Sequence, residues 1–409
     1  MNKMRLIGTL LFIPSLLITG CDTNKSTSSE TDQLYRVGYD AGYADGHNGN
    51  DMNYNNHGEA DYISGYNAGY NKGLEDYKNE LEEAGIRPGL NIETHTNKQA
   101  KYIADGPNYV AKYAVGTEEQ CAPSTISLDY SDFEFPTKTT FHTVKLSETE
   151  NFTKYQEYQT SGKSVNVTNL KLNTTYYWKV IGEGNGNEYE SKTYHFTTKD
   201  TVIRNLYVPG TTNWRDLGNY ITSDGKRIKQ GLIYRSAAFG FYNGETKSVI
   251  DQETANTIKY DLGIKTDIDL ANVNGIAGVT RYTYKMEYSG ISNLIDDSGN
   301  KTSIKNVFTL LGDQSKYPAV FHCTRGRDRT GAIAFLLGGY LGMSQEDLMR
   351  DYLFTNFSSS NFCEGGVITN YISYLNAFNG NSLQEKIESY LLSIGVASST
   401  LQNISEILK

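Results

Sequence analysis

The segment that decides the fold reads His322-Cys323-Thr324-Arg325-Gly326-Arg327-Asp328-Arg329-Thr330-Gly331. One apolar run, residues 319–321, precedes it, and a second, residues 332–337, follows it. Short apolar runs on either side of a glycine-containing loop are typical of a strand that turns directly into a helix. The sequence therefore predicts a strand, a tight loop and a helix in succession.

The spacing of Cys323 and Arg329 gives the predicted loop a specific chemistry. If the loop curls over the first turn of the helix, the N–H groups of residues 324–329 can converge on one point, where the helix dipole also favours negative charge. Such a point suits a phosphoryl dianion and stabilises a cysteine thiolate. An arginine can also hold two phosphoryl oxygens in a planar fork, most strongly in the transition state. We therefore expect Cys323 to attack phosphorus and Arg329 to bind the phosphoryl group.

Other loop residues are expected to support this chemistry. The Thr330 hydroxyl can hydrogen-bond to the cysteine sulfur and ease its departure, and His322 can brace the loop by bonding a backbone carbonyl. A lone cysteine beside a histidine is more often a packed core residue, but here a strand, loop glycines, an arginine and a helix coincide. The residues expected to bind substrate are Thr324, Arg325, Gly326, Arg327 and Thr330.

Several segments resemble a known family. The loop resembles that of the cysteine-dependent protein tyrosine phosphatases, and Asp328 before the arginine is similar to the bacterial tyrosine/dual-specificity branch, whose loop reads H-C-x-x-G-K-D-R-T-G. The resemblance spans roughly residues 203–357 and implies an α/β catalytic domain, which we place at residues 200–409. Four further segments resemble the family in the same order: NWRDLG at 213–218, GLIYRS at 231–236, GIKTDIDL at 263–270 and SQEDLMRDYL at 344–353.

The family's mechanism implies a role for each matching residue. It assigns Cys323 to a cysteinyl-phosphate intermediate and Arg329, with the loop amides, to binding of the transition state. Because the chain has no W-P-D segment, Asp328 is the candidate general acid and then base; the alternative is that it only bonds loop amides. Asp269, at the end of a predicted strand, is expected either to orient Arg329 by an ion pair or to be an ordinary turn residue.

The chain departs from the family pattern at a few positions. Arg327 stands where lysine is usual, and with Arg325 it adds positive charge that favours multiply charged substrates, such as phosphoinositides or inositol phosphates, alongside phosphotyrosine. Ala271 stands where an arginine is usual, and Asn219 replaces a common glycine. None of these changes removes a group required for the first chemical step, and no cofactor or metal is expected.

The beginning of the chain predicts its location. Lys3 and Arg5 precede an apolar run that ends in a small-residue site before Cys21, and this pattern resembles a bacterial lipoprotein signal over residues 1–20. The resemblance implies lipid on Cys21, a flexible stalk at residues 21–33, and an extracytoplasmic protein anchored to the bacterial cell membrane. The alternative is a plain secretory signal or a short membrane anchor.

Length, charge and cysteine usage limit the number of domains, the kinds of partner and the disulfides that we expect. A chain of 409 residues is too long for one ordinary domain. A formal net charge of −9 makes a nucleic-acid partner unexpected. The four cysteines do not indicate a disulfide framework, because Cys21 would carry lipid and Cys323 must stay reduced, which leaves Cys121 and Cys363 in different predicted domains.

A tyrosine and glycine repeat follows the stalk. The pattern YxxGYxxGYxxG at residues 35–46 recurs at residues 62–73, an offset of 62 − 35 = 27 residues. A spacing of four places the glycines on one stripe of a helix. This predicts two helices packed backbone to backbone in a hairpin over residues 34–90, with tyrosines bordering the contact. We prefer structural packing to a wall- or glycan-binding surface.

An all-β sandwich is predicted over residues 97–199. Segments of alternating polarity are separated by turn-rich stretches, and LKLNTTY at residues 170–176 resembles the tyrosine-corner region of fibronectin type III domains. This resemblance implies a spacer by default, or else a module with a carbohydrate or protein ligand. The residues expected to face its core are Tyr176, Trp178 and Val180.

These observations predict a multidomain protein, with a short Gly/Tyr helical hairpin, a fibronectin type III-like sandwich and an α/β tyrosine-phosphatase-like catalytic domain in that order. The expected function is a cell-surface lipoprotein phosphatase that acts on phosphorylated proteins or phosphoinositides. One alternative is a phytase-like inositol polyphosphate phosphatase. The other is a non-enzymatic adhesin whose loop only binds phosphate; the intact Cys323, Asp328 and Arg329 speak against it.

Overall fold

The structure is a computed structural model, and it describes residues 28–54, 57–106, 121–242, 245–246, 249–288, 294–358 and 364–409. The chain divides into two compact units, Met1–Ala84 and Gly85–Lys409. Cys21 and Cys363 lie outside the described residues, so the predicted signal and lipid site stay predictions. The flexible stalk predicted at residues 21–33 is wrong at its end, because residues 28–33 are helical. Within the described ranges, no helix combines the length and the apolar character needed to cross a bilayer.

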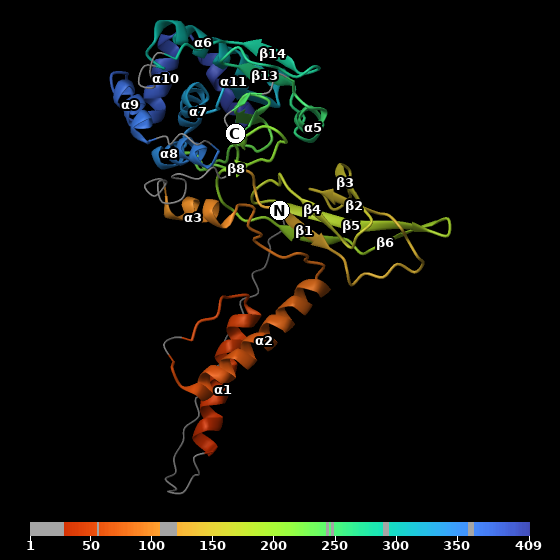
Figure 1. Ribbon diagram of the computed structural model, residues 1–409. Helices are drawn as coiled ribbons and strands as arrows, with labels where there is room; N and C mark the ends of the chain where they lie inside the picture. Colours follow the sequence, from red (N-terminus) through yellow and green to blue (C-terminus); the bar gives the residue numbers. More distant parts are fainter. Residues whose placement is uncertain are drawn as a thin grey trace. The chain divides into compact units, whose positions relative to one another are not determined.

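The first unit is a helical hairpin made by the repeat. Helix α1 (Ser28–His47) packs along α2 (Ala60–Glu83), as Figure 1 shows in red and orange. A Cβ atom built on Gly42 would overlap the carbonyl oxygen of Tyr66 and lie 2.7 Å from its carbonyl carbon, and Gly69 stands in the same relation to Tyr39. Only glycine permits so close an approach, because any side chain would push the backbones apart. The predicted backbone-to-backbone packing is confirmed.

The boundary predicted for the hairpin was too late in the sequence. The unit ends at Ala84, and the residues that follow belong to the second unit. The amide of Arg87 donates to His195 O at 2.8 Å, and the amide of Ile92 donates to Thr197 O at 2.9 Å. Residues 85–92 therefore extend a sheet of the second unit, because their backbone groups find partners there.

An all-β part opens the second unit, and its strands pair antiparallel. One sheet pairs β1 (Ile126–Asp129) with β4 (Ser164–Val167). The strands of the other sheet are, in spatial order, β3 (Tyr155–Thr160), β2 (His142–Ser147), β5 (Thr175–Gly184) and β6 (Asn187–Glu190), with β7 (Tyr194–Thr197) also paired to β5.

Alternation along β5 supplies the core of this part. Tyr176, Trp178 and Val180 are buried in one apolar cluster, as predicted, because side chains two apart on a strand share a face. The amide of Lys171 donates to the Tyr176 hydroxyl at 2.7 Å. This bond ties the turn before β5 to the strand, which is what the tyrosine-corner pattern predicts.

Helix α3 corrects the predicted start of the sandwich at residue 97. It runs over Asn97–Asp105, begins with a Thr96 capping box, and lies outside both sheets. Its Tyr102 is fully buried in the core of the α/β part, residues 200–409, and donates to Arg350 O at 2.8 Å. Residues 97–105 therefore form a helix that packs on the α/β part of the chain and do not belong to the sandwich.

The α/β part is built on a six-stranded sheet. The parallel part of this sheet consists of β14, β13, β15 and β10. At the other edge, β9 pairs antiparallel with β10, and β8 pairs antiparallel with β9. The predicted strand before Cys323 is confirmed as β15, and the segments GLIYRS and GIKTDIDL contain β10 and β13. The sheet order is β14 (Thr280–Thr283), β13 (Thr266–Asp269), β15 (Ala319–His322), β10 (Ile233–Ser236), β9 (Arg215–Asp216) and β8 (Arg204–Asn205). Outside this sheet, β11 (Phe241–Tyr242) pairs with β12 (Glu245–Thr246).

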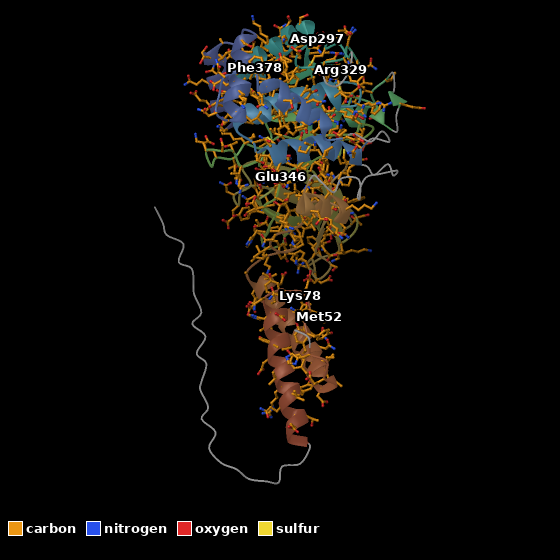
Figure 2. All side chains as sticks on the ribbon, turned by 90° about the vertical axis from the view of Figure 1, so that its left-hand side faces the viewer. Met52, Lys78, Asp297, Arg329, Glu346 and Phe378 are labelled. Carbon is orange, nitrogen blue, oxygen red and sulfur yellow. The ribbon has the colours of Figure 1, made fainter. Side chains whose placement is uncertain are left out.

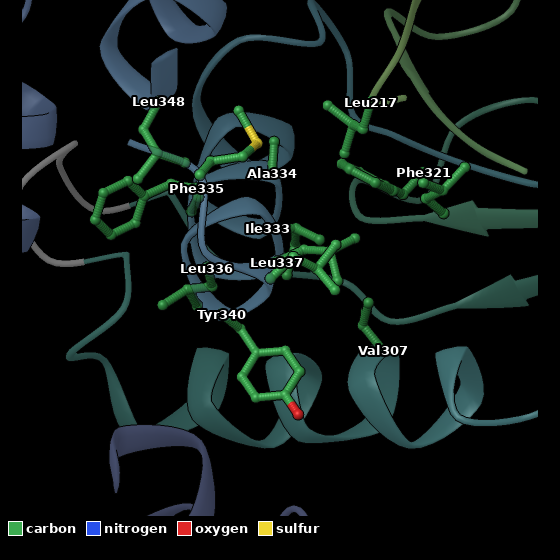
Figure 3. Packing of buried hydrophobic residues seen from close by; sticks show 14 of the residues in the cluster. Leu217, Val307, Phe321, Ile333, Ala334, Phe335, Leu336, Leu337, Tyr340 and Leu348 are labelled. Atoms are coloured by element: carbon green, nitrogen blue, oxygen red, sulfur yellow. The ribbon is translucent and has the colours of Figure 1, made fainter. Parts of the chain in front are cut away.

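Helices cover both faces of this sheet, as predicted. On one face Phe321 packs with Ile333 and Leu337 of α7 (Figure 3). On the other, Val320 packs with Ile258 of a short π-helical turn (Thr257–Asp261) that continues α5 (Gln252–Asn256). The remaining helices are α6 (Ser298–Leu311), α7 (Asp328–Leu341), α8 (Gln345–Phe354), α9 (Gly366–Leu375), α10 (Leu383–Ser393) and α11 (Ser398–Leu408).

A buried arginine joins the sandwich to the catalytic sheet. Arg204 on β8 donates to Asp216 Oδ2 on β9 at 2.7 Å, and also to the carbonyls of Leu170 and Asn169 at 3.1 and 2.7 Å. The side chains of the pair are 7% and 0% exposed. The Arg204–Asp216 pair is as deeply buried as the ion pairs near residues 322–331 that are described below. Among the described residues it makes no hydrogen bond with that segment.

Candidate active site

The predicted strand, loop and helix form as expected around Cys323. Strand β15 ends at His322 and α7 begins at Asp328, so the cysteine lies where a central parallel strand ends. Ligands of open α/β sheets bind at this edge. Cys323 is 3% exposed, so a reacting group would meet its sulfur at the base of the loop.

The backbone of the loop is held from outside. Among the described residues, the amides of Thr324, Arg325 and Gly326 have no protein acceptor. With the carbonyls already bonded to surrounding elements, these amides are left for an anion. The carbonyl bonds are from Leu270 N to His322 O at 2.8 Å, Ala238 N to Thr324 O at 3.0 Å, Asn213 Nδ2 to Arg325 O at 3.0 Å and Arg235 Nη2 to Gly326 O at 2.8 Å.

Gly326 is required by this close packing. Its φ is +66°, and a Cβ atom there would lie 2.5 Å from the carbonyl carbon of Ser236 and 2.6 Å from the Ala237 nitrogen. Both are backbone atoms, so no side-chain rotation could relieve the overlap. The loop therefore rests directly on the chain that leaves β10.

Arg329 reaches back across the loop, as predicted. It lies in the first turn of α7, and its side chain is labelled in Figure 2. Its Nη2 donates to Thr324 Oγ1 at 3.3 Å and its Nη1 to Met286 O at 3.5 Å. Thr324 follows Cys323 directly, so the guanidinium lies over the start of the loop, where a phosphoryl group on the sulfur would be within its reach.

Asp328 has a different partner from those expected. Its Oδ1 accepts a hydrogen bond from Arg327 Nε at 3.0 Å, and its side chain is 13% exposed. The carboxylate is thus at the loop with a cation beside it. Its role as general acid stays a prediction.

Asp269 does not orient Arg329. Its carboxylate is ion-paired with Arg281 on the neighbouring strand β14 and accepts the amides of Ala271 and Val273 at 2.8 and 3.0 Å. The prediction of an Arg329 pair was wrong. The parallel register explains why, because Asp267, two residues earlier on the same face, lies opposite Arg281.

The supporting roles predicted for His322 and Thr330 are also corrected. His322 Nε2 is bonded to Asp267 Oδ1 at 2.7 Å, with both side chains fully buried, and not to a backbone carbonyl. The Thr330 hydroxyl is buried and has no hydrogen-bond partner in the described parts of the chain, so it makes no contact of this kind with Cys323. His322 therefore braces the loop through the adjacent strand β13.

Sequence reasoning missed a cluster of three buried charged residues. Arg215 on β9 donates Nε to Asp351 Oδ1 on α8 at 3.0 Å, and Arg235 on β10 is ion-paired with the other oxygen of Asp351. Both arginines are fully buried. Each residue belongs to a motif quoted above, but only Arg235 stands as a single charge in a largely apolar segment, GLIYRS. Charged residues are rarely buried unless they are paired, so Arg235 was the one visible signal.

The charges of this cluster do not cancel. Two arginines share one carboxylate, which leaves a net charge of one positive unit among the three residues. Burial alone would raise the pKa of Asp351, but the charges of Arg235 and Arg215 outweigh it and hold that pKa below its ordinary value. Burial and the charge of Arg215 lower the pKa of Arg235. The loop thus lies beside a fixed positive charge in a water-poor region.

The comparisons with known proteins agree with this geometry. Residues 206–365 match the profile of the tyrosine phosphatase family. A protein of Cupriavidus necator with the provisional name tyrosine-protein phosphatase is 27% identical, over 37% of this chain and 63% of the relative. A tyrosine-protein phosphatase of Nostoc commune is 28% identical, over 25% of this chain and 43% of the relative. The chain thus spans less than two thirds of either curated relative.

One solved structure shows a fainter likeness. It is the core catalytic domain of the PP-IP phosphatase SIW14 from S. cerevisiae in complex with citrate, at 15% identity and a TM-score of 0.25, covering 42% of this chain and 84% of that chain. A likeness at that score carries nothing about the substrate. The family match lies within the second unit and supports a tyrosine-phosphatase-like domain there.

Proposed function

We propose that this chain is a cysteine-dependent phosphatase that hydrolyses phosphomonoesters through a cysteinyl-phosphate intermediate. The observation that carries the proposal is the polarity of the loop. Its carbonyls are bonded to the surrounding elements, while the amides of residues 324–326 have no acceptor in the described parts of the chain. Cys323 lies at one end of the loop, with the Arg329 guanidinium over it. A loop in that arrangement binds a tetrahedral oxyanion next to a thiol.

Two steps follow from these positions. In the first, the Cys323 thiolate forms a bond to phosphorus, the ester bond breaks, and Asp328 gives a proton to the leaving oxygen. In the second, Asp328 takes a proton from a water molecule that attacks the cysteinyl phosphate, which releases inorganic phosphate and restores the thiolate. Arg329 and the loop amides stabilise the equatorial oxygens in both steps.

Arg325 supports a substrate with more than one anionic group. Its side chain makes no hydrogen bond or ion pair with the described residues, whereas Arg327 is paired with Asp328. A cation without a partner at the edge of a phosphate site adds affinity for a second phosphate or a carboxylate. We propose phosphotyrosine in acidic peptides and phosphoinositides as substrate classes, with inositol polyphosphates as the alternative.

The parts before the catalytic domain define the proposed setting. We propose a lipoprotein held outside the cell membrane by lipid on Cys21, with the hairpin and a fibronectin type III-like sandwich as spacers. The bond from Lys171 N to Tyr176 and the two-sheet core support the sandwich assignment. Globomycin, which blocks lipoprotein signal cleavage, should then leave an uncleaved precursor; cleavage of a Cys21→Ala variant as efficiently as the native chain would contradict the lipid site.

The mechanism is tested by Cys323→Ser in the full-length chain. We expect loss of p-nitrophenyl phosphate turnover with retained binding of vanadate, because the loop amides and Arg329 remain. Cys121→Ser is the matched control, since Cys121 is also a buried thiol but contacts the Asn213 amide at 2.9 Å rather than substrate. Undiminished turnover in Cys323→Ser would refute the mechanism.

The substrate class is tested with Arg325→Ala against Arg327→Ala. On p-nitrophenyl phosphate, which carries one phosphate, Arg325→Ala should leave kcat/KM nearly unchanged. On a phosphatidylinositol bisphosphate or inositol hexakisphosphate it should lower kcat/KM about tenfold, as one lost charge-assisted contact implies. Equal losses on every substrate would contradict a second anionic subsite, and binding without any turnover by the native chain would favour the adhesin alternative.

A further inference from the structure

The buried cluster of Arg215, Arg235 and Asp351 is placed to act on the catalytic loop. Arg235 lies opposite Phe321 in the parallel register of β10 and β15, two residues before Cys323. Its Nη2 donates to Gly326 O at 2.8 Å, and the same nitrogen would lie 3.8 Å from a Cβ atom on Gly331. The Arg235 guanidinium therefore contacts the middle of the loop and lies close to the first turn of α7.

We propose that Arg235, oriented by Asp351, is a positioning residue that fixes Gly326 and supplies the positive charge that the Cys323 thiolate and the phosphoryl group require. The inference rests on the proposed function and adds to it a source of charge outside the loop. Asp351 sets the size of that charge, because it neutralises only one of the two arginines. The other contacts of Arg215 are neutral: Asn213 Oδ1, Asp351 O and Thr355 Oγ1.

The placement of the charge argues for a role beyond stability. A lone buried ion pair joins one cation to one anion, as Arg204 and Asp216 do. An extra buried cation is costly unless an anion compensates it, and a negative charge on Cys323 would raise the pKa of Arg235. The net positive charge of the cluster is thus balanced by an anion only when the thiolate or a bound phosphoryl group is present.

Three variants of the full-length chain separate charge from hydrogen bonding. Arg235→Met removes both, Arg235→Lys keeps the charge but not the fork, and Asp351→Asn raises the net charge of the cluster to two positive units. Arg204→Met is the matched control, because it breaks a buried ion pair in the same sheet without contacting the loop. All variants leave unchanged the titratable and charged residues of the loop and of the strands next to it, namely His322, Arg325, Arg327, Asp328, Arg329, Asp267, Asp269 and Arg281.

The first readout is alkylation of Cys323 by iodoacetamide across pH, followed on the Cys323 peptide by mass spectrometry. Arg235→Met should move the alkylation profile to higher pH by about one unit, the size expected for one nearby charge. Asp351→Asn should move it in the opposite direction. Arg235→Lys and Arg204→Met should leave it close to that of the native chain.

Turnover of p-nitrophenyl phosphate gives the second readout. Arg235→Met should lower kcat about 10-fold to 100-fold with little change in KM, since the loop is misplaced in the transition state more than in the substrate complex. Arg235→Lys should recover part of that loss. Thermal melting compares each variant with Arg204→Met, which should lose similar stability but keep kcat.

Two results would overturn the proposal. One is an Arg235→Met chain, as stable as Arg204→Met, with native alkylation and native kcat. The other is a shift in the same direction for Arg235→Met and Asp351→Asn, which a general loosening of the fold would produce. Alkylation does not depend on turnover, so a native chain that hydrolyses no phosphomonoester would refute the proposed function while this test still decides the role of Arg235.

Discussion

Replacing Gly326 with alanine should damage catalysis far more than it damages stability. Two effects act at this position. The first is backbone strain, because φ is +66° and an alanine in the left-handed region costs about 1–2 kcal/mol. The second is a collision with the backbone of Ser236 and Ala237, where the new carbon would lie 2.6 Å from the Ala237 nitrogen, against roughly 3.5 Å for an ordinary contact.

The collision decides the size of the catalytic effect. Relieving it requires the loop to move away from β10 by roughly 1 Å, and a displacement of that size costs about 100-fold in kcat when it misplaces a reacting group. Gly225→Ala is the matched control, because Gly225 has a φ of +76° and nothing within 4 Å of a Cβ atom. An alanine at position 225 has the same kind of backbone strain as an alanine at position 326 but meets no neighbouring atom.

The assay is kcat for p-nitrophenyl phosphate together with the thermal midpoint of each variant. We expect Gly225→Ala to lose stability with native kcat, and Gly326→Ala to lose kcat by about two orders of magnitude. A Gly326→Ala enzyme with kcat within a few-fold of the Gly225→Ala enzyme would refute the reasoning, since it would show that the loop does not rest on that backbone.

Two further predictions concern the hairpin and the buried cluster. Gly42→Ala should separate α1 from α2 and speed hydrogen exchange in both helices, whereas Gly58→Ala, with nothing within 4 Å of a Cβ atom, should not; equal exchange in the two variants would contradict the packing. Asp351→Asn should lower the thermal midpoint at neutral pH, because two buried arginines lose their anion, a change that costs about 3–5 kcal/mol. The folded pKa of Asp351 is lowered, so the carboxylate stabilises the fold above the unfolded value of about 3.9 and loses that contribution as pH falls through the folded value. The difference between variant and native midpoints should therefore shrink in acid, and a difference that stays constant with pH would contradict the pair.

The strand, loop and helix around Cys323 were predictable because their signals are local. Apolar runs fix the strand and helix, and the spacing of cysteine and arginine fixes the chemistry, so neither depends on distant parts of the chain. The partners of Asp269 and His322 were not predictable in the same way. These partners depend on which strands are neighbours and on their register. Strand β14 has no apolar run, so the sequence did not indicate a strand there.

The buried cluster and helix α3 show the same limit. Arg215, Arg235 and Asp351 are separated by 20 and 116 residues (235 − 215 and 351 − 235), and only the folded sheet with α8 upon it brings them together. The three charged residues were visible within the quoted motifs, but nothing in their spacing identified their partners. Helix α3 was assigned to the sandwich because it precedes those strands, while its apolar side packs on a domain that begins about a hundred residues later.

The regular glycine spacing of the hairpin has a consequence for its alignment. Sliding α1 along α2 by four residues, about 6 Å, would again set glycines against tyrosine carbonyls, so steric fit alone leaves several alignments almost equivalent. The connecting segment breaks this degeneracy, because the Asn53 amide donates to the Tyr66 hydroxyl at 2.8 Å and the Tyr70 hydroxyl donates to Asn50 O at 2.8 Å. The two helices could therefore align in several ways that differ by one helical turn, and the hydrogen bonds of the connecting segment select one of them.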